Sequence, residues 1–408
     1  MKSLFKTTSY LFMLWLVLAA EGLAQTPAPS LDAKAWETVN RSVDDLYREG
    51  KISQAQIKAG ESLALAKKIF GPDHLNVAVA SDKLALFSKV NGRYAEAEAL
   101  YKSIIDIVTK KMGAGHVALA ATYTNLGEVY MSQDKYEQAF AMHNQALEIR
   151  KQALGPDHLE VAISLNHLAG VFRFQNKFEE AENYYMQSLK ILENNFGMVH
   201  PDIAVCLNNL AGLYRIGKKY ILAEDFYKRV IEIWRKLGGP DDSNVAAAKN
   251  SLALLYTDML RYDEAINLHK EVLDSLEIAE GAESPDRAVS LNNLGKIYRF
   301  QGRLDEATIM TAQALQILRQ QFGESHPTIA NTMNNQALIL AAQARFSEAI
   351  DLQEQSLRML EKTLGKNHYY VADLLEDMIR VFEKVGQKGK IKKYQERINQ
   401  IRKPVGTK

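Results

Sequence analysis

Histidine is the side chain in this sequence with the clearest capacity for chemistry, because imidazole binds metals and transfers protons near neutral pH. The 408-residue chain contains nine histidines. Six of them follow a glycine by three residues, at spacings of 42 residues or a multiple of 42: His74, His116, His158, His200, His326 and His368. Equivalent positions in stacked units lie along one edge, so they cannot bring three ligands around one ion. We therefore predict that these histidines bond to the starts of helices, and we predict no metal or cofactor.

The other reactive side chains do not form a known catalytic pattern. His143 and His269 occupy a column otherwise held by tyrosines, which indicates packing, and His167 is isolated. Cys206 is the only cysteine and lies beside an apolar stripe, which favours a partly buried thiol over a nucleophile. No HExxH, GxxxxGK[ST], GxSxG or CxxC motif is present. We predict that the chain is not an enzyme, and an enzyme with an unrecognised site is the alternative.

A column of asparagines is the strongest candidate for a binding surface. Its members are Asn166, Asn208, Asn250, Asn292 and Asn334. Residues four and seven positions further on share their helix flank, and several of these are cationic: Arg173, Arg215, Lys296 and Arg299. An amide both donates and accepts hydrogen bonds, which suits a peptide main chain, and arginine can hold a carboxylate by two bonds. We predict a peptide-binding groove here. Alternatively, the asparagines only bridge adjacent repeats or persist from duplication.

These side chains must be positioned by a repeating unit, which is clearest in Gly197–Leu237. This stretch reads as a turn, a helix over Pro201–Ile216 and a second helix over Tyr220–Leu237. The same glycine recurs every 42 residues from Gly71 to Gly365, together with columns of leucine, alanine and aromatic residues. A single hairpin cannot bury both of its faces, so the copies must stack. The sequence therefore predicts an all-α solenoid.

The repeat resembles the tetratricopeptide family. Its consensus spacing is met by Leu210, Ala211, Tyr214, Ala223 and Tyr227, and the 42-residue period is similar to that of kinesin light chains. The resemblance implies a right-handed superhelical solenoid of antiparallel helix hairpins. It also implies that the first helices line a concave groove, where asparagine ladders grip peptide main chain. No heptad region precedes the repeats, so only the repeat architecture is carried over.

Both ends of the chain depart from the repeat. Lys2 and Lys6 precede an apolar run and small residues, which is typical of a secretory signal peptide. An uncleaved membrane anchor is the alternative, although the run is short for a span. The expected organisation is a signal peptide over 1–24, a linker over 25–30, a degenerate capping hairpin over 31–70, seven repeats over 71–364, a second degenerate capping hairpin over 365–396 and a basic tail over 397–408. We expect a secreted or periplasmic protein without a membrane span after cleavage.

Overall charge excludes one class of partner. Lys plus Arg number 50 and Asp plus Glu number 49, which argues against nucleic-acid binding. We predict a scaffold that binds a protein or peptide ligand, either acidic or with a free C-terminus. The alternative is a structural or self-assembling envelope component that uses its ends or convex face. The basic C-terminal end reads as a solvated capping helix, with contact to an anionic surface as the other interpretation.

Overall fold

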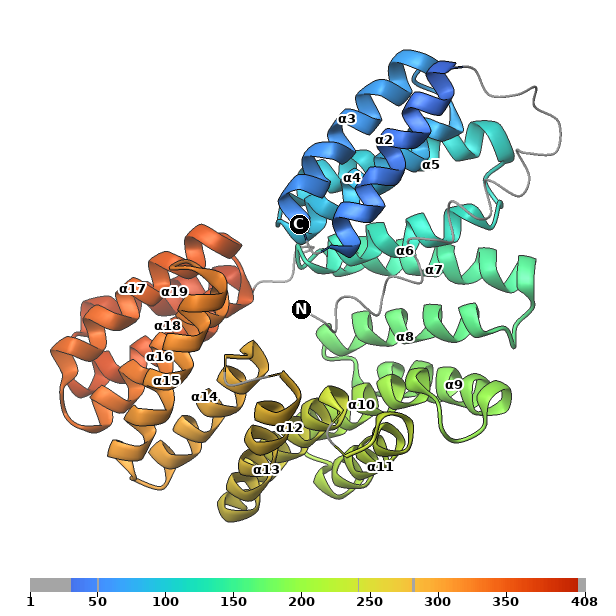
Figure 1. Cartoon of the computed structure of the whole chain (residues 1–408). Coiled ribbons are helices and arrows are strands. Elements are labelled where there is room, and N and C mark those ends of the chain that lie inside the picture. Colours follow the sequence, from blue (N-terminus) through green and yellow to red (C-terminus); the bar gives the residue numbers. More distant parts are fainter. Residues whose placement is uncertain (1–30, 50, 241, 281–282, 403–408) are drawn as a thin grey trace. The chain divides into compact units, whose positions relative to one another are not determined.

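The computed structural model describes residues 31–49, 51–240, 242–280 and 283–402. Within these ranges the chain forms eighteen helices and no strand, paired as first and second helices of successive hairpins (Figure 1). The first helices are α2 (Leu31–Arg48), α4 (Leu75–Val90), α6 (Ala118–Met131), α8 (Leu159–Phe174), α10 (Pro201–Ile216), α12 (Ser243–Asp258), α14 (Pro285–Phe300), α16 (Pro327–Ala342) and α18 (Tyr369–Lys384). The second helices are α3 (Ile52–Phe70), α5 (Tyr94–Met112), α7 (Tyr136–Leu154), α9 (Phe178–Phe196), α11 (Tyr220–Gly238), α13 (Tyr262–Glu280), α15 (Leu304–Phe322), α17 (Phe346–Leu364) and α19 (Lys388–Ile401). The predicted all-α tetratricopeptide architecture is confirmed.

Histidine starts most of the first helices, as predicted. In α16 the Nδ1 atom of His326 accepts a hydrogen bond from the backbone N–H of Thr328 at 3.2 Å, and Pro327 occupies the first helical position. This bond satisfies one of the N–H groups that a helix start leaves unpaired. The same bond to the residue two positions on is made by His74, His116, His158, His200 and His368. Asp242 and Ser284 replace histidine in α12 and α14.

Glycine ends most of the second helices. Gly155 has φ 91° and ψ 157°, a backbone conformation that residues with a Cβ rarely adopt. A glycine after the last turn of a helix commonly adopts the left-handed helical conformation. The observed ψ is instead extended, so the chain leaves the helix directly toward the next first helix.

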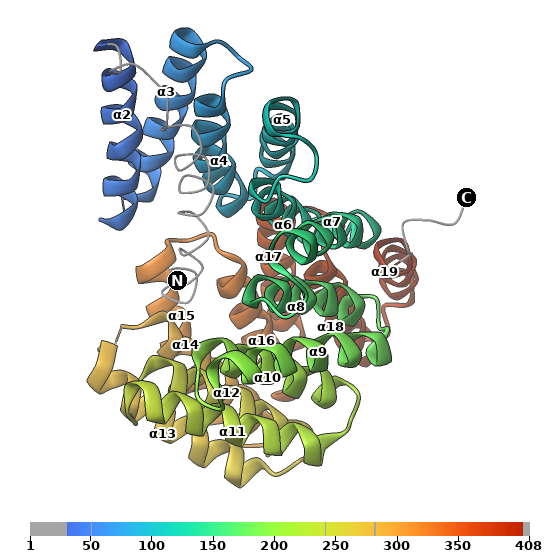
Figure 2. The ribbon, with the colours of Figure 1, turned by 90° about the vertical axis from the view of Figure 1, so that its right-hand side faces the viewer.

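The chain divides into two compact units, residues 1–191 and 192–408. In the N-terminal unit α2 and α3 lie side by side and are followed by α4 and α5 (Figure 2). Its largest apolar cluster includes Ile104, Leu119 and Leu126. In the C-terminal unit the last cluster joins Leu357 on α17 to Phe382 on α18. The alanine column of the second helices is fully buried, which permits the close approach of paired helices.

The ends differ in how far the structure describes them. Helices α2 and α3 form the first hairpin, within the predicted 31–70 segment. At the other end α19 continues to Ile401, five residues beyond the predicted boundary at 396. The predicted signal peptide and linker, residues 1–30, lie outside the described residues, as does the end of the basic tail, residues 403–408.

Candidate binding groove on the first helices

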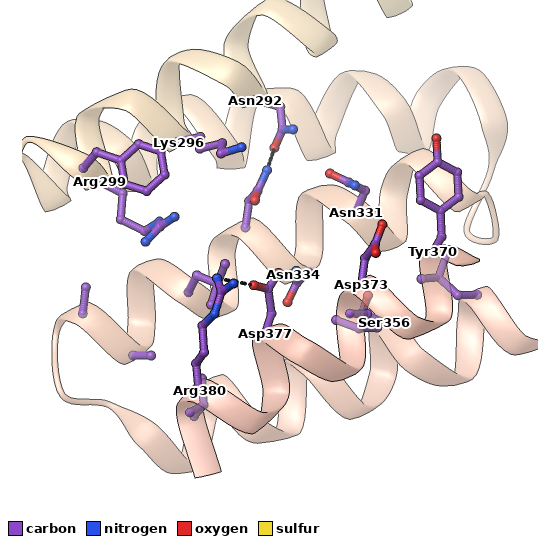
Figure 3. Close-up of a pocket in the computed structure, with 18 of the residues that line it drawn as sticks. Asn292, Lys296, Arg299, Asn331, Asn334, Ser356, Tyr370, Asp373, Asp377 and Arg380 are labelled. Atoms are coloured by element: carbon purple, nitrogen blue, oxygen red, sulfur yellow. Dashed lines mark hydrogen bonds and ion pairs between the residues drawn. The ribbon is translucent and has the colours of Figure 1, made fainter. Parts of the chain in front are cut away.

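A cavity of about 1030 Å³ lies in the C-terminal unit and is lined mainly by the first helices of three successive hairpins, α14, α16 and α18. Figure 3 shows side chains from these helices directed into one space. Four of the predicted groove residues line it: Asn292, Lys296, Arg299 and Asn334. The structure therefore brings together the part of the predicted groove that comes from α14 and α16.

The middle of the cavity is an amide layer. Asn335 on α16 donates a hydrogen bond from Nδ2 to Oδ1 of Asn292 on α14, at 2.9 Å. Asn334 donates from Nδ2 to Oδ2 of Asp377 on α18, at 2.7 Å. Both bonds join residues that are 43 positions apart. In this part of the cavity, a residue on one first helix therefore faces the residue 43 positions later on the next first helix. One turn earlier on α16, Asn331 is exposed at the cavity wall.

A cationic layer follows at the C-terminal ends of the same helices. The guanidinium carbon of Arg299 lies 4.5 Å from the ring centre of Phe300, and its Nε atom is buried without a hydrogen-bond partner. Burial lowers the pKa of Arg299 below its ordinary value. Among the described residues, neither Lys296 nor Arg299 forms an ion pair. Arg380 on α18 does form one, with Asp377 at 3.1 Å.

The register explains why Arg299 forms no ion pair. Arg215, two repeats earlier in the same column, pairs with Asp258, 43 positions ahead, at 2.5 Å. The residue 43 positions after Arg299 is Ala342, which has no charge to offer. The charge of Asp377 reaches Arg299, but this carboxylate forms its ion pair with Arg380. A half-buried guanidinium without an ion pair of its own is a favourable place for an anionic group of a ligand.

The remaining asparagines of the column bridge helices. Asn166 donates from Nδ2 to Oγ of Ser188 on α9 at 2.9 Å. Asn250 accepts at Oδ1 from Nδ1 of His269 and from Oγ of Ser290, both at 2.9 Å. Asn334 likewise accepts from Gln353 at 3.0 Å in addition to its bond with α18. Most of these amides therefore tie a first helix to its own partner helix or to the next repeat.

The other predicted groove residues do not line the cavity. Asn166 and Arg173 lie on α8 in the N-terminal unit, while Asn208 and Arg215 lie on α10 and Asn250 on α12. Asn208 is half-buried. A single strip of five asparagines along the whole chain stays a prediction.

Several groove residues were missed from the sequence. Arg380 lies 84 positions after Lys296 in the same column, so the period alone would have identified it. Asn331, Tyr370 and Asp373 carry no repeat signal, and only the folded cavity brings them together. Asn40 also belongs to the asparagine column by its spacing, and it is buried with its Oδ1 accepting from Oγ of Ser62 at 3.1 Å.

Of the three histidines outside the helix starts, His143 and His269 are buried, as the packing prediction required, and His167 is half-buried. The prediction that His167 is isolated was wrong, because its ring stacks on His143 with 4.9 Å between centroids and faces Glu128. Among the described residues no group of three or more His, Cys, Asp or Glu can hold a metal ion. Cys206 is fully buried rather than partly buried.

None of the helices in the described part of the chain is both long and apolar enough to cross a bilayer. This finding concerns residues 31–402 with their gaps and does not reach the predicted signal peptide.

Comparisons with solved structures place this fold among repeat proteins. A Rap protein complexed with competence and sporulation factor matches with a TM-score of 0.59 and 16% identity, covering 91% of this chain and 98% of that one. Aspartyl phosphate phosphatase F from Bacillus subtilis matches with a TM-score of 0.57 and 15% identity, covering 94% and 98%. Nearly identical repeats of a Podosopora anserina kinesin light chain match with a TM-score of 0.45 and 22% identity, covering 51% and 97%. At these identities the likeness is one of fold. No curated protein sequence matches the chain.

The family model is more specific than these structural matches. The model for the tetratricopeptide repeat matches residues 81–152, 118–194, 202–278, 245–320, 286–362 and 328–401. These segments cover well over half of the sequence and span most of the described hairpins. The chain belongs to the tetratricopeptide repeat family.

Proposed function

We propose that this protein is a non-enzymatic scaffold that holds an extended acidic peptide segment in the cavity on α14, α16 and α18. The observation that carries this proposal is the pair Lys296 and Arg299, which line the cavity beside an amide layer and form no ion pair among the described residues. A Rap protein of similar fold was solved in complex with competence and sporulation factor, which agrees with a binding role for such hairpin stacks.

The chemistry of the cavity matches a peptide with a carboxylate. Side chain or C-terminal carboxylates can accept bonds from Lys296 and Arg299, and the half-buried position of Arg299 strengthens such a pair relative to one in open solvent. Asn331 is exposed at the wall and can both donate to and accept from a peptide main chain. The volume of about 1030 Å³ is at the upper end of the range for ligand pockets, so it accommodates several residues.

The same lining argues against catalysis. It contains no histidine or cysteine, and its two carboxylates are already engaged: Asp373 by Arg402, and Asp377 by Asn334 and Arg380. The fold likeness to aspartyl phosphate phosphatase F suggests the assay that would contradict this part of the proposal. Release of phosphate from an acyl phosphate by the purified protein, at rates well above the uncatalysed reaction, would show an enzyme.

We also propose that the protein works outside the cytoplasm. Positively charged and then apolar residues at the start of the sequence support a cleaved signal peptide over residues 1–24. Intact-mass measurement of the protein from the culture fluid and from the periplasm tests this. A mature species that still carries the first 24 residues contradicts it.

The peptide-binding proposal is tested with a displayed library of random dodecapeptides. We expect enrichment of acidic sequences, and we expect affinity for the enriched peptides to fall with added salt. In the double variant Lys296→Met with Arg299→Met the affinity drops at least about tenfold, because charge-assisted hydrogen bonds are lost while the apolar stems remain. Lys270→Met, on the exposed side of α13, is the matched control. Enrichment without charge preference, or unchanged binding by the double variant, refutes the proposal.

Two asparagine variants separate binding from stability. Asn331→Ala removes an exposed amide at the cavity, so it weakens peptide binding by about threefold to tenfold with little change in melting temperature. Asn250→Ala leaves His269 and Ser290 without their shared acceptor, so it lowers the melting temperature and leaves peptide binding unchanged. The opposite pattern would show that the bridging asparagines, rather than the cavity wall, hold the ligand.

A further inference from the structure

The cavity has a second end whose chemistry is opposite to that of Lys296 and Arg299. Near the start of α18 its lining changes to Tyr370 and Asp373, with Asn331 of α16 beside them (Figure 3). Tyr370 is 42% exposed, and Asp373 is exposed as well. An aromatic ring next to a carboxylate is a favourable environment for an ammonium or guanidinium group.

The chain itself shows that the Asp373 carboxylate accepts a guanidinium, although this one does not line the cavity. Arg402, at the end of α19, places one nitrogen 3.0 Å from a carboxylate oxygen of Asp373. Its other terminal nitrogen lies 2.5 Å from Glu376, which is not part of the cavity lining. Because Arg402 is paired with two carboxylates, its ion pair with Glu376 remains when a cationic group of a ligand binds Asp373. Desolvation raises the pKa of Asp373 above its ordinary value even with Arg402 present, so this one partner does not fully satisfy the carboxylate.

We propose that the Asp373 end of the groove binds a basic side chain of the ligand, which displaces Arg402 from Asp373. This inference rests on the proposed function, and it narrows the partner to a peptide with an acidic and a basic residue at a set separation. Lys384, the last residue of α18, is a further cation in the cavity lining, and it lies eleven positions after Asp373 on the same helix. That is about 16 Å along the helix axis, the span of about five extended residues. The groove thus selects the order and the spacing of charges in its ligand.

The test uses three synthetic peptides on the same neutral Ala/Ser background. The first carries two glutamates and, five residues away, two lysines. The second has glutamines in place of the lysines, and the third has the same composition as the first with the charges interleaved. The first two peptides, in which like residues are grouped in blocks, are each made in two versions, with the glutamates nearer the N-terminus or nearer the C-terminus. Binding is measured by fluorescence anisotropy at low salt.

In the wild-type protein we expect the tighter-binding version of the first peptide to bind about fivefold more tightly than the other two peptides. Asp373→Asn brings this ratio to about one, while Asp274→Asn, an exposed change on α13, leaves it unchanged. Arg402→Gln frees Asp373 and raises the ratio further. Circular dichroism melts confirm that each variant is folded.

Two results would overturn this inference. One is equal affinity of the wild-type protein for all three peptides, and the other is a preference that survives in Asp373→Asn. If the acidic peptides bind through Lys296 and Arg299 but the lysines add nothing, the proposed function stands and only the basic subsite is refuted. If none of the peptides binds, both are refuted.

Discussion

At the scale of single residues, the same side chain has different roles according to its position in the repeat. Histidine at a helix start is half-exposed and accepts a backbone bond, as His326 does. Histidine in the packing column is buried, and burial lowers the pKa of His143 to about 3 and that of His269 to about 4. Both buried imidazoles are therefore neutral at physiological pH, and burial also lowers the pKa of His326 at its helix start.

Asp82 gives a prediction at this scale. It occupies the asparagine column of α4, is only 8% exposed, and burial raises the pKa of its carboxyl to about 6. Between pH 4 and pH 6 the folded state holds a proton that the unfolded state has released, so stability falls as the pH rises through this window. At pH 7 the ionised carboxylate of Asp82 lowers the free energy of unfolding by its full amount, about 3 kcal/mol at most. Asp82→Asn restores the column residue and should recover that cost at pH 7.

Urea unfolding followed by circular dichroism at pH 7 and pH 4 checks this prediction. We expect a higher midpoint for Asp82→Asn at pH 7 and a much smaller difference from wild type at pH 4, where residue 82 is uncharged in the folded state of both proteins. Asp106→Asn, an exposed change on α5, should shift neither midpoint. A gain that persists at pH 4 would show that it arises from packing instead of charge.

At the scale of elements, the contact between the two helices of a hairpin depends on one small residue in the first helix. At Gly127 on α6, a Cβ would lie 2.6 Å from the ring of His143 on α7. At Gly170 on α8, the nearest atom to a Cβ would be the Tyr185 hydroxyl at 3.9 Å. Gly127 belongs to the column of small residues, as does Gly295, where a Cβ would lie 2.7 Å from Thr311, whereas Gly170 stands one position after that column.

This contrast predicts opposite effects of the same substitution. Gly127→Ala forces His143 away from α6 and should cost on the order of 1–3 kcal/mol of stability. Gly170→Ala has room for the methyl group and should be neutral or stabilising by up to about 1 kcal/mol, because alanine favours helix. Thermal unfolding of the two variants measures the difference, and equal effects would contradict it.

At the scale of the whole molecule, the cations near the ends of the first helices are paired in some repeats and unpaired in others. In the N-terminal unit Lys83 pairs with Asp44 at 2.7 Å and Lys89 with Glu128 at 2.5 Å. Lys89 stands in the same repeat column as Arg299, which has no such partner. Arg173 in the N-terminal unit also stands in this column with a buried Nε that has no hydrogen-bond partner, and Arg215 in the C-terminal unit is paired with Asp258, so pairing in this column varies from repeat to repeat.

The last hairpin should act as a cap for the C-terminal unit. Leu357 and Leu360 of α17 pack into a cluster with apolar residues of α18, including Leu374, Leu375 and Phe382. A chain that stops at Leu364 exposes this face, and in repeat proteins a missing cap causes association. Light scattering should show oligomers of the truncated chain, while a chain ending at Arg402 stays as the full-length protein. An unassociated truncated chain with an unchanged melting temperature would contradict a capping role.

The sequence by itself determined the helices, because the local residue types set where each helix begins and ends. The predicted helix Pro201–Ile216 is α10, and the helix predicted over Tyr220–Leu237 is α11 with one further residue. Turn glycines, histidine caps and the 3.6-residue apolar period act within a few positions, so they can be read without knowledge of the fold. The period then required the copies to stack.

Only the tertiary structure decided which side chains are free to bind. The asparagine column lies on the flank where a first helix meets its neighbours, so the destination of each amide depends on residues 19 to 43 positions away, such as His269 for Asn250 and Asp377 for Asn334. In the same way, Arg215 forms an ion pair with Asp258, and Arg299 forms none because position 342 is alanine. The physical reason is that hydrogen bonds and ion pairs require contact, and contact between repeats is set by a register that a helical period does not specify.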